Sequence, residues 1–139
     1  MRKILTALLF AAALPAAARM PEHTGPEKNI TAQTLAELTQ TAADLERQLL
    51  QLPENTDLHI KLGFTYTRLG RADDAQRAFE SAIRLDPKRA IAHYMLGLIY
   101  EKKGLRDRAV TAWKACLENA GDPKMRNTAV KHLNNLGAR

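Results

Sequence analysis

The sequence predicts a single all-α domain built from packed pairs of helices, and three observations support this. Alanine (23) and leucine (20) dominate the 139 residues, whereas valine and isoleucine together number 8. These proportions favour helices over strands. Apolar residues recur at steps of three and four, which is the period of an amphipathic helix. The pattern of residues 56–89 also recurs directly afterwards, over residues 90–123.

Residues 1–18 have the pattern of a cleavable signal peptide. Arg2 and Lys3 precede an apolar run over residues 4–14, and small residues follow at positions 16–18. The segment from residue 4 to residue 18 is shorter than the roughly 20 residues that span a membrane. We expect cleavage after Ala18 and a periplasmic or secreted protein whose membrane contact ends at cleavage. Retention of the segment as an anchor is the alternative.

Residues 19–30 are expected to be a flexible leader because they contain Pro21, Gly25 and Pro26 and few apolar side chains. A helical domain is then predicted over residues 31–139. Its first helix covers residues 31–52, with Thr31 as its cap and Pro53 as its stop. The apolar positions of this helix are Leu35, Leu38, Ala42, Leu45, Leu49 and Leu52.

Residues 56–89 and 90–123 form two copies of one repeat. Laying the first range over the second aligns eight identical pairs, among them Leu62 with Leu96, Tyr66 with Tyr100 and Ala75 with Ala109. The remaining pairs are His59/His93, Gly63/Gly97, Gly70/Gly104, Asp73/Asp107 and Ala78/Ala112. Phe79 and Trp113 are a conservative pair in the same register. Glycine, tyrosine and alanine would not fall in step by chance.

This pattern resembles the tetratricopeptide repeat, a helix–turn–helix unit of about 34 residues. The matching residues of the first copy are Leu62, Gly63, Tyr66, Ala75, Phe79, Ala82 and Pro87. Those of the second copy are Leu96, Gly97, Tyr100, Ala109, Trp113 and Cys116. His59 and His93 depart from the family pattern, and the second closing proline, Pro123, comes two residues late. The resemblance implies a right-handed α-solenoid of antiparallel helix pairs.

The repeated residue types have physical roles in such pairs. Gly63 and Gly97 lack a Cβ and let the partner helix approach. Gly70 and Gly104 are expected to end the first helices in a left-handed conformation. Tyr66 and Tyr100 are expected to fill the gap between successive pairs.

Both flanks are predicted to complete the stack, because two repeats alone bury too little core. The helix over residues 31–52 is interpreted as a degenerate half-repeat, since Pro53 precedes Pro87 by the length of one repeat. A capping helix over residues 123–137 is predicted to begin after Asp122 at Pro123 and to end at Gly137. Its apolar face consists of Met125, Ala129, Leu133 and Leu136, and its polar face of Lys124, Arg126, Lys131 and Asn134.

Catalytic, cofactor-binding and metal-binding residues are not predicted. The chain has no glycine-rich phosphate loop, no H-E-x-x-H and no G-x-S-x-G motif. Cys116 stands at a small-residue position and is expected to be buried, and a single cysteine excludes an internal disulfide. His59 and His93 are expected at the edge of the core, although a metal or proton-sensing pair is the alternative. Basic residues are interleaved with acids at a net charge of +6, which does not favour nucleic acid.

The predicted function lies on a second apolar face of the first helices, about 160° from Leu62. In a solenoid of this family that face would line a concave groove. The nine groove residues are Ile60, Lys61, Phe64, Arg68, Ile91, Tyr94, Met95, Leu98 and Lys102. An apolar floor with a basic rim suits an amphipathic helix or an extended peptide with acidic residues. The carboxylate clamp of some family members is not expected, because apolar residues occupy its floor positions.

We therefore expect an exported, non-enzymatic protein-interaction module, acting as an adaptor, scaffold or assembly factor of a bacterial cell envelope. The alternative is a self-associating structural subunit that uses the same apolar face as an oligomer interface. The helix over residues 31–52 could also cover this face.

Overall fold

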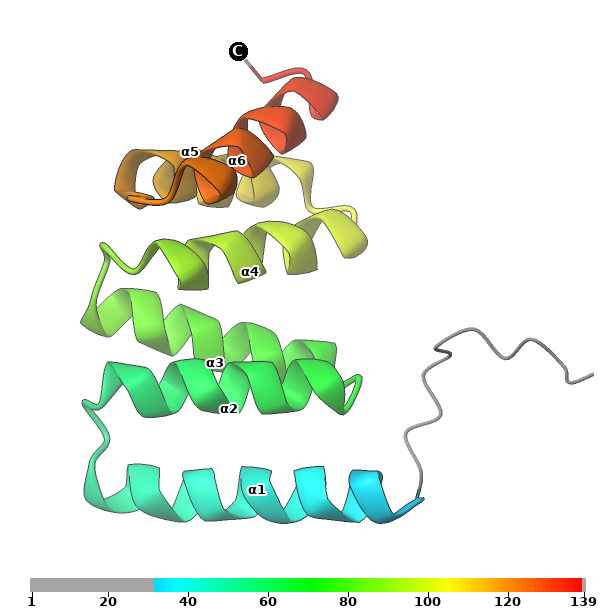
Figure 1. Ribbon diagram of the computed structural model, residues 1–139, viewed down its shortest axis with the longest axis vertical. Helices are drawn as coiled ribbons and strands as arrows, with labels where there is room; N and C mark the ends of the chain where they lie inside the picture. The colour runs from blue at the N-terminus through cyan, green and yellow to red at the C-terminus, as the bar shows by residue number, and fades with distance from the viewer. Residues whose placement is uncertain (1–31, 139) are drawn as a thin grey trace, which may run out of the picture.

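The computed structural model describes residues 32–138, which form a stack of six helices (Figure 1). In chain order the helices are α1 (Ala32–Gln51), α2 (Thr56–Arg68), α3 (Ala72–Leu85), α4 (Ala90–Lys102), α5 (Arg106–Asn119) and α6 (Pro123–Asn135). The part of the chain that the structure describes contains no strand. The predicted all-α solenoid, with two helix pairs and flanking helices, is confirmed.

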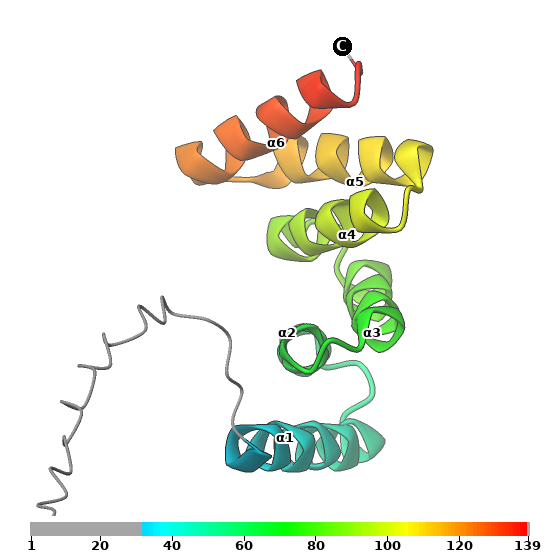
Figure 2. The ribbon, with the colours of Figure 1, turned by 90° about the vertical axis from the view of Figure 1, so that its right-hand side faces the viewer.

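The helices follow one another along the stack, with α1 at one end and α6 at the other (Figures 1 and 2). The pairs α2–α3 and α4–α5 have the most extensive contacts. Each helix otherwise packs on its neighbour in sequence, so the core runs through the stack. The largest fully buried side chains are Trp113, Phe79, Leu96 and Cys116.

One glycine in each helix pair allows the two helices to pack closely. A Cβ on Gly63 would lie 2.7 Å from Cζ of Phe79, and a Cβ on Gly97 would lie 2.6 Å from Cε2 of Trp113. Both distances are shorter than any van der Waals contact. The predicted close approach is therefore confirmed, and the group that fills the space is the aromatic ring of the second helix.

The ends of the helices follow the sequence signals. Gly70, Gly104 and Gly137 have φ values of 72°, 71° and 67°, which are left-handed and end α2, α4 and α6 as predicted. At the start of α6, the Asp122 side chain accepts a hydrogen bond from the Met125 amide at 3.0 Å. Pro123 takes the first position of this helix, where its missing N–H has no cost.

Helix α1 occupies the place of a second helix of a preceding pair. The Tyr66 hydroxyl donates a hydrogen bond to Glu46 of α1. The Tyr100 hydroxyl donates one to Glu80 of α3 at 2.7 Å, which is the same contact one repeat later. The half-repeat predicted before Pro53 thus packs on α2 as α3 packs on α4.

Two of the apolar positions predicted for α1 lie outside the core. Leu38, Ala42 and Leu45 are buried, but Leu35 is 48% exposed and Leu52 is 55% exposed. The helix ends at Gln51, so Leu52 leaves the periodic face. α1 has one neighbouring helix, and it can bury a narrower stripe than a helix packed on both sides.

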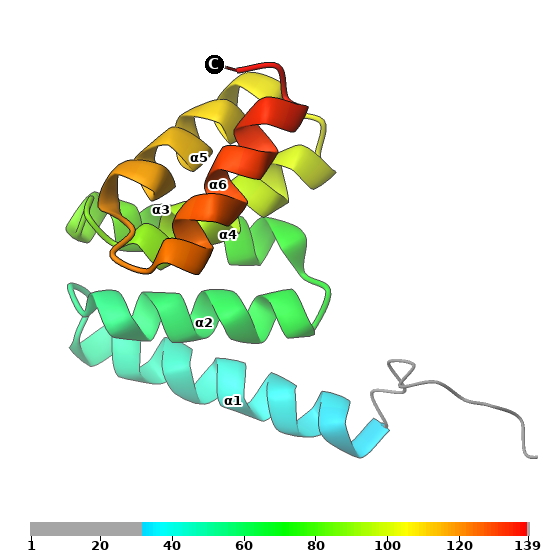
Figure 3. The same ribbon diagram turned by 45° about the horizontal axis from the view of Figure 1, so that its top comes forward.

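Helix α6 completes the opposite end and lies beside α5 (Figure 3). Ala129 and Leu133 are buried, and Met125 and Leu136 pack against the core as predicted. The His132 ring stacks on Trp113 with ring centroids 4.2 Å apart. Glu101 of α4 accepts hydrogen bonds from Trp113 Nε1 at 2.7 Å and from His132 Nδ1 at 2.9 Å. This cluster joins α4, α5 and α6.

The signal peptide expected at residues 1–18, the leader at 19–30 and the Thr31 cap lie outside the described residues. Within the described part of the chain, none of the helices is both long and apolar enough to cross a membrane.

Candidate partner-binding surface

The nine groove residues lie on the two first helices, α2 and α4. Ile60, Lys61, Phe64 and Arg68 belong to α2, and Ile91, Tyr94, Met95, Leu98 and Lys102 belong to α4. The three basic residues and Phe64 are exposed, whereas the other five are half-buried. The exposed fraction of Phe64 is 37%.

The apolar groove residues pack part of their surface against the fold itself. Phe64 meets Phe79 edge to face, with ring centroids 5.4 Å apart and an interplanar angle of 85°. Tyr94 meets Trp113 in the same way, at 5.1 Å and 84°. Each of these two rings therefore packs on the aromatic ring of the second helix in its own pair. Within the described residues, no ring contact joins Phe64 to Tyr94.

Helix α1 packs on the opposite side of α2 from Phe64. Tyr66 of α2 donates a hydrogen bond to Glu46 of α1, so the Tyr66 side of α2 faces α1. Since Phe64 lies about 160° from Tyr66 around the helix axis, α1 and Phe64 occupy different sides of α2.

By the register of its flanking residues, α6 corresponds to a third first helix. Arg89 and Gly104 flank α4, and Asp122 and Gly137 flank α6 with the same separation. In that register, Asn127 and Lys131 of α6 correspond to Tyr94 and Leu98 of α4, and both are exposed. The sequence pattern places Lys131 only on a polar outer face. The turn between α5 and α6 is one residue shorter than the turn between α3 and α4. A sequence comparison at the 34-residue spacing of the first two copies therefore does not align α6 with α4.

His59 and His93 have a structural role that the sequence did not reveal. Nε2 of His93 donates a hydrogen bond to the Pro87 carbonyl at 2.7 Å, and Nε2 of His59 donates one to the Pro53 carbonyl at 2.8 Å. A carbonyl only accepts, so Nε2 carries the proton in both rings. Arg126 of α6 repeats the contact by donating to the Ala120 carbonyl at 3.3 Å.

These three contacts join each first helix to the turn before it. The expected position at the core edge agrees with the low exposure of His93, which is 9%. In the described part of the chain, no three His, Cys, Asp or Glu side chains lie close enough together to hold a metal ion.

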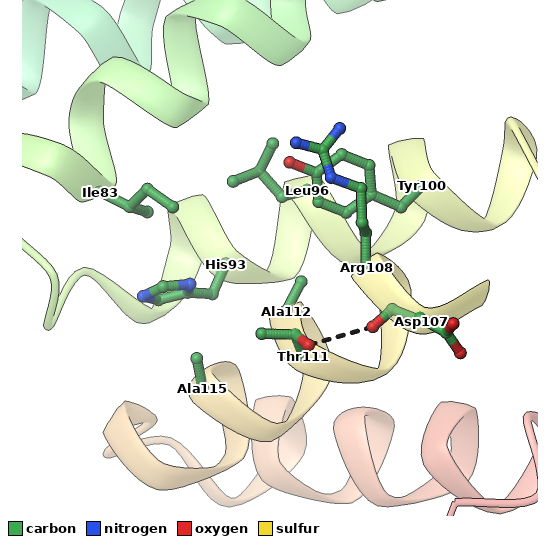
Figure 4. A pocket seen from close by; sticks show the side chains of 9 residues that line it. All are labelled: Ile83, His93, Leu96, Tyr100, Asp107, Arg108, Thr111, Ala112 and Ala115. Carbon is green, nitrogen blue, oxygen red and sulfur yellow. Dashed lines mark hydrogen bonds between the residues drawn. The ribbon is translucent and has the colours of Figure 1, made fainter. Parts of the chain in front are cut away.

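A cavity of about 320 Å³ lies elsewhere, between α3, α4 and α5 (Figure 4). Sequence reasoning did not find it. Its lining residues are Ile83, His93, Leu96, Tyr100, Asp107, Arg108, Thr111, Ala112 and Ala115. The sequence does contain a signal for this cavity, which is a loss of side-chain volume on α5 relative to α3. Arg77 and Ser81 of the first repeat correspond to the smaller Thr111 and Ala115 of the second.

The polar groups at the cavity edge come from α3, α4 and α5. The Arg108 guanidinium lies over the Tyr100 ring, 5.0 Å from its centroid. Burial, together with the hydrogen bond to Glu80, raises the pKa of Tyr100 to about 12. The phenol is therefore neutral and donates to Glu80 at physiological pH.

Cys116 is fully buried. Burial raises the pKa of its thiol to about 11, which makes the reactive thiolate rare near neutrality. The position agrees with the predicted role of a small core residue.

Two antiparallel helix pairs of equal spacing, closed by a half-pair at each end, define the chain as an α-solenoid repeat protein. Residues 60–122 match the family model described as tetratricopeptide repeat. This part of the chain therefore consists of tetratricopeptide repeats. Repeats of this family generally mediate protein–protein interactions and are typically non-catalytic. No curated protein matches the chain.

Proposed function

We propose that this protein is an exported interaction module that holds a peptide or helix of a partner protein on the groove residues. It serves as an adaptor or assembly factor of the cell envelope and carries out no catalysis. The observation that supports this most directly is the partial exposure of apolar side chains on two successive first helices. Phe64 is 37% exposed, and Ile60, Tyr94 and Leu98 are half-buried. Exposed apolar side chains of this kind mark interaction sites when they are grouped.

The charge of the same face indicates the chemistry of the partner. Lys61, Arg68 and Lys102 are exposed and form no ion pair within the described residues. Lys131 adds a further exposed cation on α6. A partner segment with apolar anchors and flanking carboxylates complements this surface.

Export is proposed from the sequence of residues 1–18 alone. The mature protein then begins at Arg19 and acts in the periplasm or outside the cell. The mass of the chain recovered from an envelope fraction tests this.

The function is tested by capture of partners from the envelope fraction of the producing cell. The tagged protein is compared with the double variant Phe64→Asp/Tyr94→Asp and with the charge variant Lys61→Glu/Lys102→Glu. We expect both to recover at least about tenfold less partner. The charge variant alters only exposed side chains, so it separates lost binding from lost folding. Leu50→Asp is the matched control, because Leu50 is 80% exposed on α1.

Circular dichroism shows whether each variant keeps its helical content. Full capture by a folded charge variant and a folded double variant would contradict the assignment of the groove residues. Recovery of untagged copies of this chain, lost in the same variants, would instead favour the alternative of a self-associating subunit.

A further inference from the structure

The cavity between α3, α4 and α5 lies on a different side of α4 from the groove residues. Leu96 lines the cavity, whereas Tyr94 and Leu98 are each about 160° from it around the helix axis. A ligand in the cavity and a partner on the groove residues would therefore contact opposite sides of one helix.

The cavity has the size and lining of a small-ligand site. Its volume of about 320 Å³ is at the lower end of the range of ligand pockets, about 300–1,000 Å³. A cavity of about 150 Å³ already holds a benzene ring. Ile83, Leu96, Ala112 and Ala115 supply an apolar wall (Figure 4). A single ring or a branched aliphatic group with a short side chain fits this space.

Arg108 supplies a cation with free donors at the edge of the cavity. Its ion pair with Glu80 spans 3.9 Å, which is too long for a hydrogen bond. Glu80 already accepts hydrogen bonds from Tyr100 at 2.7 Å and from Gln76 at 2.8 Å. The Asp107 carboxylate is 99% exposed and turned away from the cavity (Figure 4). The guanidinium can therefore receive a carboxylate in the bidentate geometry that arginine favours.

The preceding repeat differs in how its guanidinium is paired. Arg71 lies over the Tyr66 ring, 4.6 Å from its centroid, but it is already paired with Asp74. Asp74 stands on α3 where α5 has Arg108, and it forms ion pairs with Arg71 and Arg77. The first repeat thus has a carboxylate already paired with two arginines at this place. At this place in the second repeat, Arg108 has no hydrogen-bonded partner within the described residues and stands beside an apolar space.

We propose that the cavity binds a small organic carboxylate with an apolar body, such as a single-ring aromatic acid. The apolar body enters between Ile83, Leu96 and Ala115, and the carboxylate pairs with Arg108 at the edge. Binding is non-covalent. This site is separate from the proposed partner-binding function, and either can fail without the other.

The test is a titration of the ¹⁵N-labelled chain with 3-phenylpropionate, followed by amide chemical shifts. We expect saturable shifts centred on Thr111, Ala112 and Ala115. Arg108→Gln is expected to weaken binding about tenfold, which is the loss of one charge-assisted pair. The neutral analogue 3-phenylpropionamide should bind the unaltered protein about tenfold more weakly than the acid does. Its affinity should be the same for the unaltered protein and for Arg108→Gln.

Two further variants separate the cavity from a general effect of charge or folding. Ala115→Leu fills the cavity and is expected to abolish saturable binding of both compounds while the protein stays helical. Lys114→Gln removes an exposed cation from the same helix and should leave binding unchanged. Absence of saturable shifts in the unaltered protein, or shifts centred on the groove residues Phe64, Tyr94 and Leu98, would overturn the proposal. Equal binding of the acid and the amide would overturn the role of Arg108.

Discussion

At the scale of single residues, the packing of each helix pair depends on an aromatic ring against a glycine. Phe79 and Trp113 are both fully buried, and both lie against the glycine of the preceding helix. Any side chain at Gly63 or Gly97 must displace a ring that has no free space to enter.

We expect Gly97→Ala to lower the free energy of unfolding by about 1–3 kcal/mol, because the new methyl group would overlap the Trp113 ring. Urea unfolding followed by circular dichroism measures the change. Gly121→Ala is the matched control, since no heavy atom lies within 4 Å of a Cβ at Gly121 and its φ is not left-handed. That control should stay within about 1 kcal/mol of the unaltered protein. Equal stabilities for the two variants would mean that Trp113 can move aside at no cost.

The identity of the tight glycines was predictable, but some of their surroundings were not. A repeat pattern that keeps glycine, alanine and an aromatic residue in step indicates close packing. The hydrogen bonds of His59 and His93 could not be predicted in the same way. They depend on where the preceding turn places its carbonyl, which no local spacing specifies.

At the scale of elements, each second helix is tied to the next first helix by a buried tyrosine and a glutamate. Tyr66 contacts Glu46, and Tyr100 contacts Glu80. Burial and the neighbouring glutamate raise the pKa of both phenols to about 12, from an ordinary value of 10.0.

These shifts predict that the fold weakens in alkali. The folded protein holds both phenolic protons up to a pH of about 12, whereas the unfolded chain releases them near pH 10. The contribution of these groups to the free energy of unfolding should therefore be constant below pH 10. It should be lost progressively between pH 10 and 12. Urea midpoints measured across this range test the effect.

Tyr66→Phe/Tyr100→Phe removes both phenols and should reduce the decline between pH 10 and 12. The part due to the buried Cys116 thiol, whose pKa is raised to about 11, should remain. Tyr94→Phe removes a hydroxyl elsewhere, leaves Tyr66 and Tyr100 in place, and should retain the decline. An equal decline in the double variant would show that other groups govern stability in alkali.

The helices themselves were largely predictable because their periodicity, caps and glycines agree. What sequence reasoning missed lies between elements. The pairing of Tyr100 with Glu80 joins residues 20 positions apart on different helices. The correspondence of Asn127 and Lys131 with the groove residues Tyr94 and Leu98 depends on one residue deleted from a turn.

At the scale of the whole molecule, the described residues form a stack of two helix pairs with a single helix at each end. Within these residues, α1 has no first helix paired with it and α6 has no second one. Polar residues such as Thr41, Gln48, Lys124 and Asn134 are exposed on these terminal helices. Capping helices with a polar outer face are what keep a short solenoid soluble.

The proposed export predicts that the mature chain lacks residues 1–18. Intact-mass measurement of the protein from the envelope fraction of a bacterial host should give a chain that begins at Arg19. Leu9→Arg interrupts the apolar run and should leave the full-length chain inside the cell. A full-length chain in the envelope fraction would instead indicate that the segment is retained as an anchor.

The candidate site was predictable in part at this scale. The period of the helix placed Phe64 and Tyr94 on one face, but it could not show how much of each ring packs on the second helix. The cavity beside Arg108 depends on side-chain volumes contributed by three helices. A one-dimensional pattern does not add these volumes together.

The hydrogen bonds that join each first helix to the preceding turn have a consequence for how such a chain can grow. His93 and the Pro87 carbonyl are six residues apart, as are His59 and the Pro53 carbonyl. A duplication of one whole repeat therefore copies the donor and the acceptor of the joint together. Each added repeat would therefore contain both partners of the hydrogen bond that joins its first helix to the preceding turn. Arg126, which makes this contact to Ala120 after a turn shortened by one residue, shows that the joint also tolerates a change of both residues.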